Sequence, residues 1–330
     1  MAVVHVVIAA IPCLVTIILG YLCLQFNLLP TDTVQPVNDF LVLICFPVLL
    51  IKLITGLDVG SMSIDYILVS LIHRLVSLVL GFILGPLLHR TIAPSINPTV
   101  ITYATFSSLV YTNTVVIGFP MALVMFGEES LDYLVVSCSL DCVTLLPAAI
   151  ITMGNTSKVG LLKNPIILSV ILGIVFKILI PAHFIELLPV QLIFDNFAPS
   201  VSGGLLFVIG MSYFVQTRTK NTEELMPLLS DMKDPQNDPK SLTFLFYCFF
   251  LRFVMAPLLM VIIGKFIFRL PPKVYAYAVF SVANPLSIAC FGISKKYKKG
   301  VSVISSLFIY THFLMVPAFI VYAKVFQWEI

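Results

Sequence analysis

The chain has 330 residues, of which 59% are hydrophobic and 11% are charged, and its mean hydropathy is +1.07. This composition excludes a soluble globular domain and indicates a polytopic helical membrane protein. The formal net charge of +3 is small, and the one dense basic run, Lys295-Lys296-Tyr297-Lys298-Lys299, lies next to an apolar span. We therefore expect that run to contact lipid headgroups and not nucleic acid.

Apolar runs of about one bilayer thickness recur along the whole chain. We expect an all-α fold of ten transmembrane helices, at residues 3–24, 38–57, 67–89, 101–126, 131–153, 165–181, 198–216, 241–268, 274–294 and 301–326. The first run has neither a basic start nor a small-residue cleavage site, so we interpret it as a retained span. The partly apolar segment 181–195 is expected to lie in the membrane interface.

The sequence offers little for enzyme chemistry. It contains no glycine-rich phosphate loop, no nucleophile elbow and no His/Cys spacing typical of a metal site. All seven cysteines fall inside the apolar runs and are interpreted as small apolar residues. We therefore predict no enzyme activity, no cofactor and no metal.

Most basic residues of the loops fall on one side of the ten spans, which by the positive-inside rule is cytosolic. They are Arg90, Lys158, Lys163, Arg218, Lys220, Lys233, Lys240, Lys295, Lys296, Lys298 and Lys299. Both termini are then extracytosolic, and the loops 154–164 and 217–240 face the cytosol. The second loop carries Glu224-Leu-Met-Pro-Leu-Leu229, which resembles an acidic dileucine sorting signal, although a plain linker explains it equally.

The two halves of the chain share short words in the same order. Tyr103-Ala-Thr-Phe-Ser107 matches Tyr277-Ala-Val-Phe-Ser281, Arg74-Leu-Val76 matches Arg252-Phe-Val254, and Pro147-Ala148 matches Pro317-Ala318. These matches predict two repeats of five spans, at 1–153 and 165–330, joined by the loop 154–164. Because each repeat has an odd number of spans, the second is expected to be inverted in the membrane.

Two spans carry polar and helix-breaking residues in their middle. The fourth holds Tyr111-Thr112-Asn113-Thr114 and then Gly118-Phe119-Pro120, and the ninth holds Asn284-Pro285. Proline removes a backbone donor and breaks or kinks a helix. Inside a membrane such breaks occur only where protein or a water-filled cavity covers them. Paired breaks in corresponding halves indicate the binding site of a secondary transporter.

These residues resemble the auxin efflux carriers, the PIN-FORMED proteins and their PIN-like relatives. The resemblance is carried by Thr112-Asn-Thr-Val-Val-Ile-Gly-Phe-Pro120, Lys163-Asn-Pro165, Gly210-Met-Ser212, Leu251-Arg-Phe253, Ala256-Pro-Leu258 and Asn284-Pro285. It covers essentially the whole chain. The pattern is most similar to the transporter-like half of the animal lysosomal cholesterol-sensing protein.

The resemblance implies two inverted five-helix repeats whose broken spans four and nine cross each other. Spans one, two, six and seven would form a scaffold, with a possible homodimer through spans two and seven. The other spans would form a unit that carries a small organic anion, such as an auxin-like carboxylate, by an elevator-type motion. The address implied is a lysosomal, endosomal or plasma membrane.

Asn113 and Asn284 are the first candidates for substrate binding, because an amide offers both a donor and an acceptor beside a helix start that attracts anions. The alternative is that each only caps its own break. Gly118, Pro120 and Pro285 are expected to shape the breaks. Second candidates are Tyr111, Thr112, Thr114 and Ser287, for which the alternative is an ordinary bond between helices.

Four ionisable residues within the spans are considered for a role in the site. Asp141 is the candidate for a coupling proton or ion, since a lone carboxylate there is costly; the alternative is a structural partner for Arg74 or Arg252. His312 is a second candidate, with a hydrogen-bonded core histidine as the alternative. Arg74 and Arg252 share a repeat position, where each could compensate an anionic substrate or pair with a helix end.

Two classes of function fit these residues. The first is a PIN-like transporter of a small organic anion. The second is a sensor that keeps the transporter fold, binds a lipid or a sterol, and signals to a partner without flux.

The sequon Asn155-Thr156-Ser157 tests the expected topology. It lies on the cytosolic side in this arrangement and should carry no glycan, so glycosidase treatment of the cell-expressed protein should leave its gel mobility unchanged. A glycan at Asn155 would contradict the orientation.

Overall fold

A computed structural model describes residues 2–58, 60, 62–154, 163–179, 188–219 and 242–326. Within these ranges every regular element is helical, apart from one isolated bridge. The elements of the first half are α1 (Ala2–Gln25), η1 (Thr31–Thr33), α2 (Val34–Phe40), η2 (Leu41–Cys45), α3 (Phe46–Gly56), α4 (Ile64–Thr91), α5 (Pro98–Val110), η3 (Thr114–Gly118), α6 (Phe119–Phe126), α7 (Glu129–Leu140), η4 (Asp141–Leu145) and α8 (Leu146–Gly154). Those of the second half are α10 (Pro165–Leu179), α12 (Leu188–Phe197), α13 (Ser200–Thr219), α15 (Leu242–Phe250), η8 (Leu251–Met255), α16 (Ala256–Val261), η9 (Ile262–Ile267), α17 (Pro272–Ala283), α18 (Ile288–Lys296) and α19 (Val301–Val325).

Seven helices in the described residues are long and apolar enough to cross a membrane. They are Val4–Gln25, Thr31–Gly56, Ile64–Thr91, Glu129–Gly154, Gln191–Val215, Thr243–Ile267 and Val301–Val325. The all-helical, multi-pass class expected from the sequence is therefore confirmed. Three expected spans differ: the sixth is the 15-residue helix α10, and the fourth and ninth are each divided into two shorter pieces.

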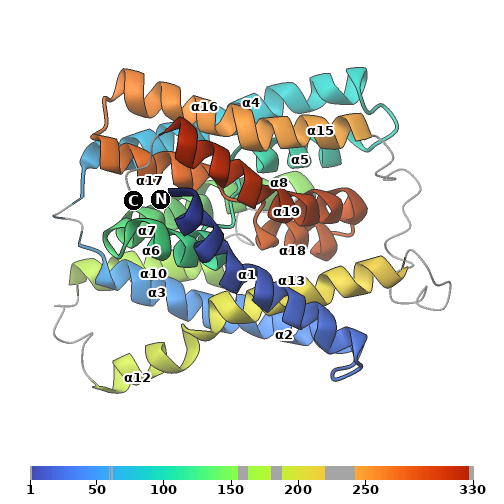
Figure 1. Ribbon diagram of the computed structural model, residues 1–330, viewed down its shortest axis with the longest axis horizontal. Helices are drawn as coiled ribbons and strands as arrows, with labels where there is room; N and C mark the ends of the chain where they lie inside the picture. The colour runs from blue at the N-terminus through green and yellow to red at the C-terminus, as the bar shows by residue number, and fades with distance from the viewer. Residues whose placement is uncertain are drawn as a thin grey trace.

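The helices form two groups that face each other across the molecule (Figure 1). α1 packs against α13, and α3 packs against α10; these helices lie together in the lower part of the view. The long helix α4 and the α15–α16 segment lie at the top, and the broken helices lie between. α1 begins and α19 ends toward the same side of the bundle (Figure 1).

Glycines allow the closest helix contact in the lower group. A Cβ atom on Gly20 of α1 would lie 2.0 Å from the carbonyl oxygen of Phe207, and one on Gly210 of α13 would lie 1.8 Å from that of Ile17. Both neighbours are backbone atoms, which cannot move aside as a side chain can. Small residues at such crossings let membrane helices approach closely, because packing and not hydrophobicity holds helices together in lipid.

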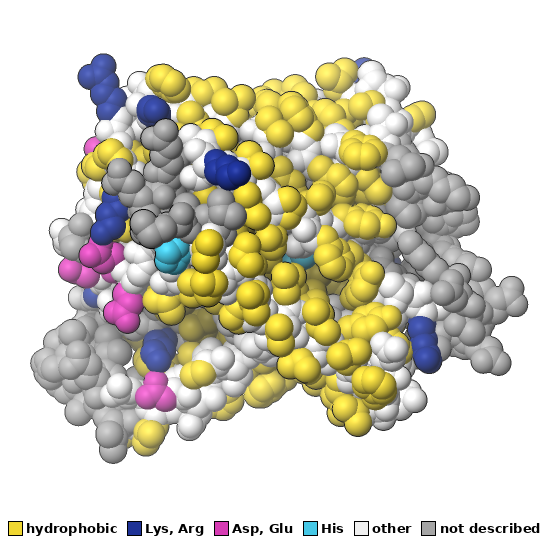
Figure 2. All heavy atoms as spheres, in the orientation of Figure 1, with side chains coloured by type: hydrophobic (Ala, Val, Ile, Leu, Met, Phe, Trp, Pro, Cys, Tyr) yellow, Lys and Arg dark blue, Asp and Glu magenta, His cyan; other side chains and the backbone are white. Residues whose placement is uncertain are grey.

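The outer surface is apolar across the middle of the molecule. Hydrophobic side chains cover the centre of the face seen in Figure 2, while most of the visible charged side chains lie toward its ends. Large residues with about half their surface exposed include Ile18, Leu43, Val79, Ile151 and Phe313. In water such an apolar surface would promote aggregation, so we expect it to face the lipid of a bilayer.

Several sequence predictions concern the connections. α13 continues to Thr219, past the expected start of the loop 217–240 at residue 217, and α8 continues to Gly154. The expected interfacial segment 181–195 contains the start of α12, at Leu188. The dileucine-like run Glu224–Leu229 and the sequon at Asn155 lie outside the described residues.

The glycine contact between α1 and α13 gives a stability prediction. Gly210→Ala should destabilise the protein by about 1–3 kcal/mol, because its methyl group collides with backbone, and a thermal unfolding scan in detergent should show a lower midpoint. Gly203→Ala in the same helix is the matched control, since a Cβ there meets nothing within 4 Å. An equal effect of the two substitutions would contradict the packing described.

Candidate functional site

Two helices are interrupted in the middle of the molecule. α5 ends at Val110 and helical structure resumes at Thr114, so residues 111–113 are not helical. α17 ends at Ala283 and α18 begins at Ile288, which leaves residues 284–287 outside a helix. All of these residues are buried. Each break therefore removes backbone groups from their helical partners in a place where solvent cannot replace them.

The two breaks satisfy part of each other's backbone. The Asn113 N–H donates to the Pro285 carbonyl at 2.8 Å, and the Ser287 N–H donates to the Tyr111 carbonyl at 3.1 Å. These two bonds frame an antiparallel bridge between Thr112 and Leu286. The remaining N–H of Leu286 donates to the Thr311 hydroxyl at 3.2 Å. Two segments far apart in sequence are thereby locked together at the centre of the fold.

Arg252 donates hydrogen bonds to backbone carbonyls at both breaks. Its guanidinium donates to the carbonyls of Tyr111 at 3.0 Å, Pro285 at 3.1 Å and Ser108 at 3.2 Å. The side chain comes from the η8 turn and is fully buried. Helix ends carry partial negative charge on their free carbonyls, so a cation here caps the end of α5 and the break before α18. This is the helix-end pairing that the sequence left open for Arg252.

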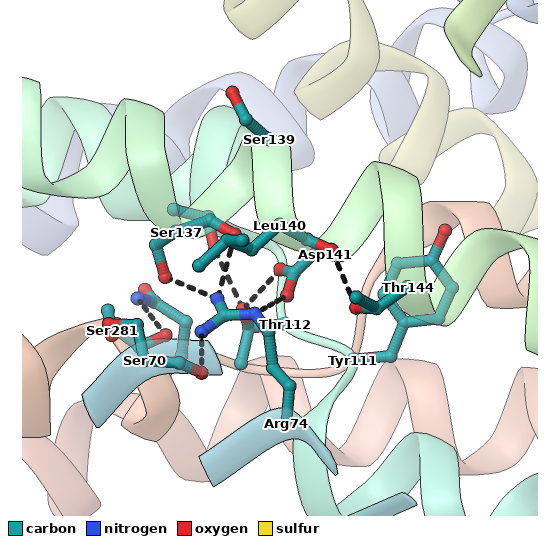
Figure 3. Close-up of polar contacts among 12 residues, drawn as sticks. Ser70, Arg74, Tyr111, Thr112, Ser137, Ser139, Leu140, Asp141, Thr144 and Ser281 are labelled. Atoms are coloured by element: carbon teal, nitrogen blue, oxygen red, sulfur yellow. Dashed lines mark hydrogen bonds and ion pairs between the residues drawn. The ribbon is translucent and has the colours of Figure 1, made fainter. Parts of the chain in front are cut away.

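Arg74 and Asp141 form a buried ion pair (Figure 3). The Arg74 Nε lies 2.6 Å from Asp141 Oδ1, and both side chains are almost completely buried. The same guanidinium donates to the carbonyl of Ser70 at 2.9 Å and to that of Ser137 at 2.8 Å. Asp141 also accepts a long bond of 3.5 Å from the Thr112 hydroxyl, so the pair reaches the first break. The sequence left two interpretations of Asp141, a coupling site or a structural partner of an arginine. The contact with Arg74 supports the second.

Asn113 and His312 contact each other across the site. Asn113 Nδ2 lies 3.1 Å from His312 Nε2, and His312 Nδ1 lies 2.5 Å from the Phe308 carbonyl. A carbonyl can only accept, so Nδ1 carries the proton that bonds to Phe308. In the neutral ring Nε2 then accepts, and the Asn113 amide donates to it. The histidine thereby fixes the orientation of the asparagine.

Asn284 has a different environment. Its Nδ2 donates to the Phe280 carbonyl at 3.0 Å and to the Ser281 carbonyl at 3.4 Å, which caps the end of α17. Its Oδ1 is buried and has no hydrogen-bond partner within the part of the chain that is described. Gly118 packs closely against this amide, because a Cβ atom on Gly118 would lie only 3.1 Å from the Asn284 Nδ2. The capping alternative thus accounts for the nitrogen of Asn284 and leaves its oxygen free.

A small cavity adjoins the two breaks. It measures about 60 Å³ and is lined by Val42, Phe46, Tyr111, Thr112, Asn113, Thr114, Val115, Val116, Cys138, Asp141, Cys142, Ile166, Leu205, Ser287, Ile288 and Ala289. The list includes the first residues of the helices that resume after both breaks. It also includes side chains from the α2–α3, α10 and α13 segments, so the cavity lies between the two helix groups. Five of the six polar residues predicted for substrate binding line the cavity, and Asn284 does not.

Gly118 and Pro120 are expected from the sequence to shape the first break. Both lie just beyond it, in the helical stretch Thr114–Phe126. Pro120 follows a wide π-helical turn, Thr114–Gly118, at the start of α6. That turn and the first-turn position accommodate the missing N–H. Pro285 lies within its break, as expected.

Sequence reasoning missed part of the polar core. Ser70, Ser137 and Thr311 each supply a bond to the ion pair or to the second break. Serine and threonine are common in membrane helices, where they usually bond to their own backbone, so the residue type alone does not distinguish these three. A helical spacing of four between Ser70 and Arg74, and between Ser137 and Asp141, was the available signal.

A multi-pass helical bundle whose two buried helix breaks meet at a small cavity has the arrangement of a secondary transporter. The chain matches the profile described as membrane transport protein over residues 5–158 and 146–323. It belongs to this membrane transport protein family, which includes the auxin efflux carriers. No protein with a curated function matches the chain.

The Arg74–Asp141 pair gives a second stability prediction. Asp141→Asn should destabilise the protein by about 3–5 kcal/mol, because it leaves a buried guanidinium without its counter-charge. Adding Arg74→Gln to Asp141→Asn should recover much of that loss, and thermal unfolding of the wild type, both single variants and the double variant measures the coupling. Additive effects would show that the two charges do not act as a pair.

Proposed function

We propose that this membrane transporter carries a small organic anion, of the auxin-like carboxylate class, and binds it where the two helix breaks meet. The observation that carries the proposal is the cavity wall. Thr114 to Val116 and Ser287 to Ala289, the beginnings of two helices, line the same buried space. Helix beginnings present free N–H groups and partial positive charge, which attract an anion.

The side chains around the cavity suit a carboxylate. Thr112, Thr114 and Ser287 offer hydroxyl donors, and the Thr112 and Thr114 hydroxyls already lie 2.7 Å apart. The Asn113 amide faces His312 at the same place. In this proposal Asn113 binds substrate, and Asn284 contributes its free oxygen or shapes the second break. Asp141 and His312 hold partners of their own and maintain the geometry of the site.

The motion proposed is of the elevator type. The fold would consist of two inverted five-helix repeats whose broken spans cross, with α1, the α2–α3 segment, α10 and α13 as the scaffold. The position of the cavity between these helices and the breaks supports this division. Its volume of about 60 Å³ accommodates a few water molecules. It is well below the roughly 300 Å³ of ordinary ligand pockets, so a larger substrate needs an open state.

Three finer expectations stay predictions, two from the family resemblance and one, the orientation, from the distribution of basic residues. They are the homodimer through spans two and seven, the extracytosolic placement of both termini, and the lysosomal, endosomal or plasma-membrane address. None of them is needed for the site proposed.

Counterflow in proteoliposomes tests the function. Radiolabelled indole-3-acetate and other small carboxylates should show saturable, protein-dependent uptake. Asn113→Ala should lower the initial rate by about tenfold or more, which is the order of one hydrogen bond to a charged group, and Asn284→Ala should also lower it. Ser139→Ala is the control, because Ser139 bonds only to the carbonyl of Val135 and points away from the cluster (Figure 3).

Two results would contradict this function. Unchanged flux in both asparagine variants would remove the site from the helix breaks. Absence of saturable flux for every carboxylate, together with saturable sterol or lipid binding, would favour the sensor that keeps a transporter fold.

A further inference from the structure

The buried charges of the described residues do not sum to zero. The arginine and carboxylate side chains that are fully or nearly fully buried there are Arg74, Arg252 and Asp141. Arg74 and Asp141 compensate each other at 2.6 Å. Arg252 has no carboxylate within ion-pair distance in the described part of the chain, and its Nε has no hydrogen-bond partner there. One positive charge therefore stays uncompensated in the centre of the bundle.

The nearby titratable groups do not alter this sum. His312 is held as a neutral ring between the Phe308 carbonyl and the Asn113 amide. His73 places Nε2 at 3.0 Å from the Ala256 carbonyl, while its Nδ1 has no partner. The buried Tyr111, Cys138, Cys142 and Cys290 are neutral in their protonated forms.

The uncompensated charge lies directly behind the cavity wall. Arg252 donates to the carbonyl of Tyr111, which lines the cavity, and to that of Pro285, two residues before Ser287 in the same wall. The guanidinium thus acts on the cavity through its field and through the two breaks, and it does not line the cavity itself. A buried cation without a counter-charge is costly, and an anion bound in the neighbouring cavity would lower that cost.

The two repeats differ at this point. Arg74 and Arg252 share a repeat position, but only Arg74 has an acidic partner. The helix that matches the one carrying Asp141 offers Thr311 and His312 to the second break, and neither supplies a negative charge. Because of this difference, the charge of Arg252 has no counter-charge in the described residues, whereas that of Arg74 has one.

From this charge balance we propose that Arg252 sets the charge of the moving part of the carrier. The empty site carries +1, and the site loaded with a monovalent anion is neutral. The loaded carrier then crosses the membrane without moving net charge, and the membrane potential acts on the return of the empty carrier. The inference rests on the proposed function, because it requires that an anion binds at the breaks.

Exchange and net flux separate these two steps. In proteoliposomes clamped with potassium gradients and valinomycin, exchange with saturating indole-3-acetate on both sides uses only the loaded carrier, whereas uptake into substrate-free vesicles also needs the empty return. A unit charge that crosses the whole field shifts an equilibrium by about 2.3 kcal/mol per 100 mV, or roughly 50-fold. Wild-type exchange should be independent of voltage, and net uptake should depend on it strongly.

Variants assign the charge to Arg252. Arg252→Gln should make exchange depend on voltage, since the loaded site then carries −1. Arg252→Lys keeps the charge while losing most of the bonds to the carbonyls, so its exchange should stay independent of voltage. The double variant Arg74→Gln with Asp141→Asn removes an ion pair without changing the sum, and its exchange should also stay independent.

The wild-type comparison alone can overturn the inference, even if a variant does not fold. Voltage-dependent exchange in the wild type, or voltage-independent exchange in an active Arg252→Gln protein, would show that Arg252 does not compensate the substrate. Saturable flux that persists in either case leaves the proposed carrier function standing. Absence of saturable anion flux in the wild type would overturn both.

Discussion

The structure depends on one constraint: a helix broken inside a membrane must find new partners for its backbone. The Asn113 N–H and the Ser287 N–H each bond to a carbonyl of the opposite break. Arg252 donates a second bond to each of these two carbonyls and a further one to the carbonyl of Ser108. A break that faced lipid would leave these groups unpaired, because lipid offers no hydrogen bonds. The meeting of the two breaks supplies part of the missing partners, and a small cavity lies beside them.

That solution has an electrostatic effect. A neutral donor at the position of Arg252 could bond to some of the same carbonyls, but a guanidinium also brings a charge that no described acidic side chain balances. Asp141 neutralises Arg74, whereas Arg252 has no acidic partner in the described part of the chain. The described core thus has one electropositive centre, and the helix beginnings at Thr114 and Ile288 add to it.

Much of the fold and part of the site could be predicted from the sequence. Hydropathy located the long spans, and the run Asn284-Pro285 located the second break, because proline has one clear backbone effect. The cluster from Tyr111 to Thr114 contains the first break, and Gly118 and Pro120 lie beyond it, since Pro120 also fits the first turn of a helix. The partners of Asp141 and Arg252 could not be assigned, because burial and direction in a bundle depend on helix rotations that apolar runs do not encode.

The most direct measurement of the central claim is an experimental structure of the protein in a bilayer mimic with saturating indole-3-acetate. The account predicts carboxylate density between the beginnings of the helices at Thr114 and Ile288, within hydrogen-bond distance of Asn113, in a cavity wider than the present 60 Å³. Substrate density elsewhere, with only water at the two breaks, would contradict it.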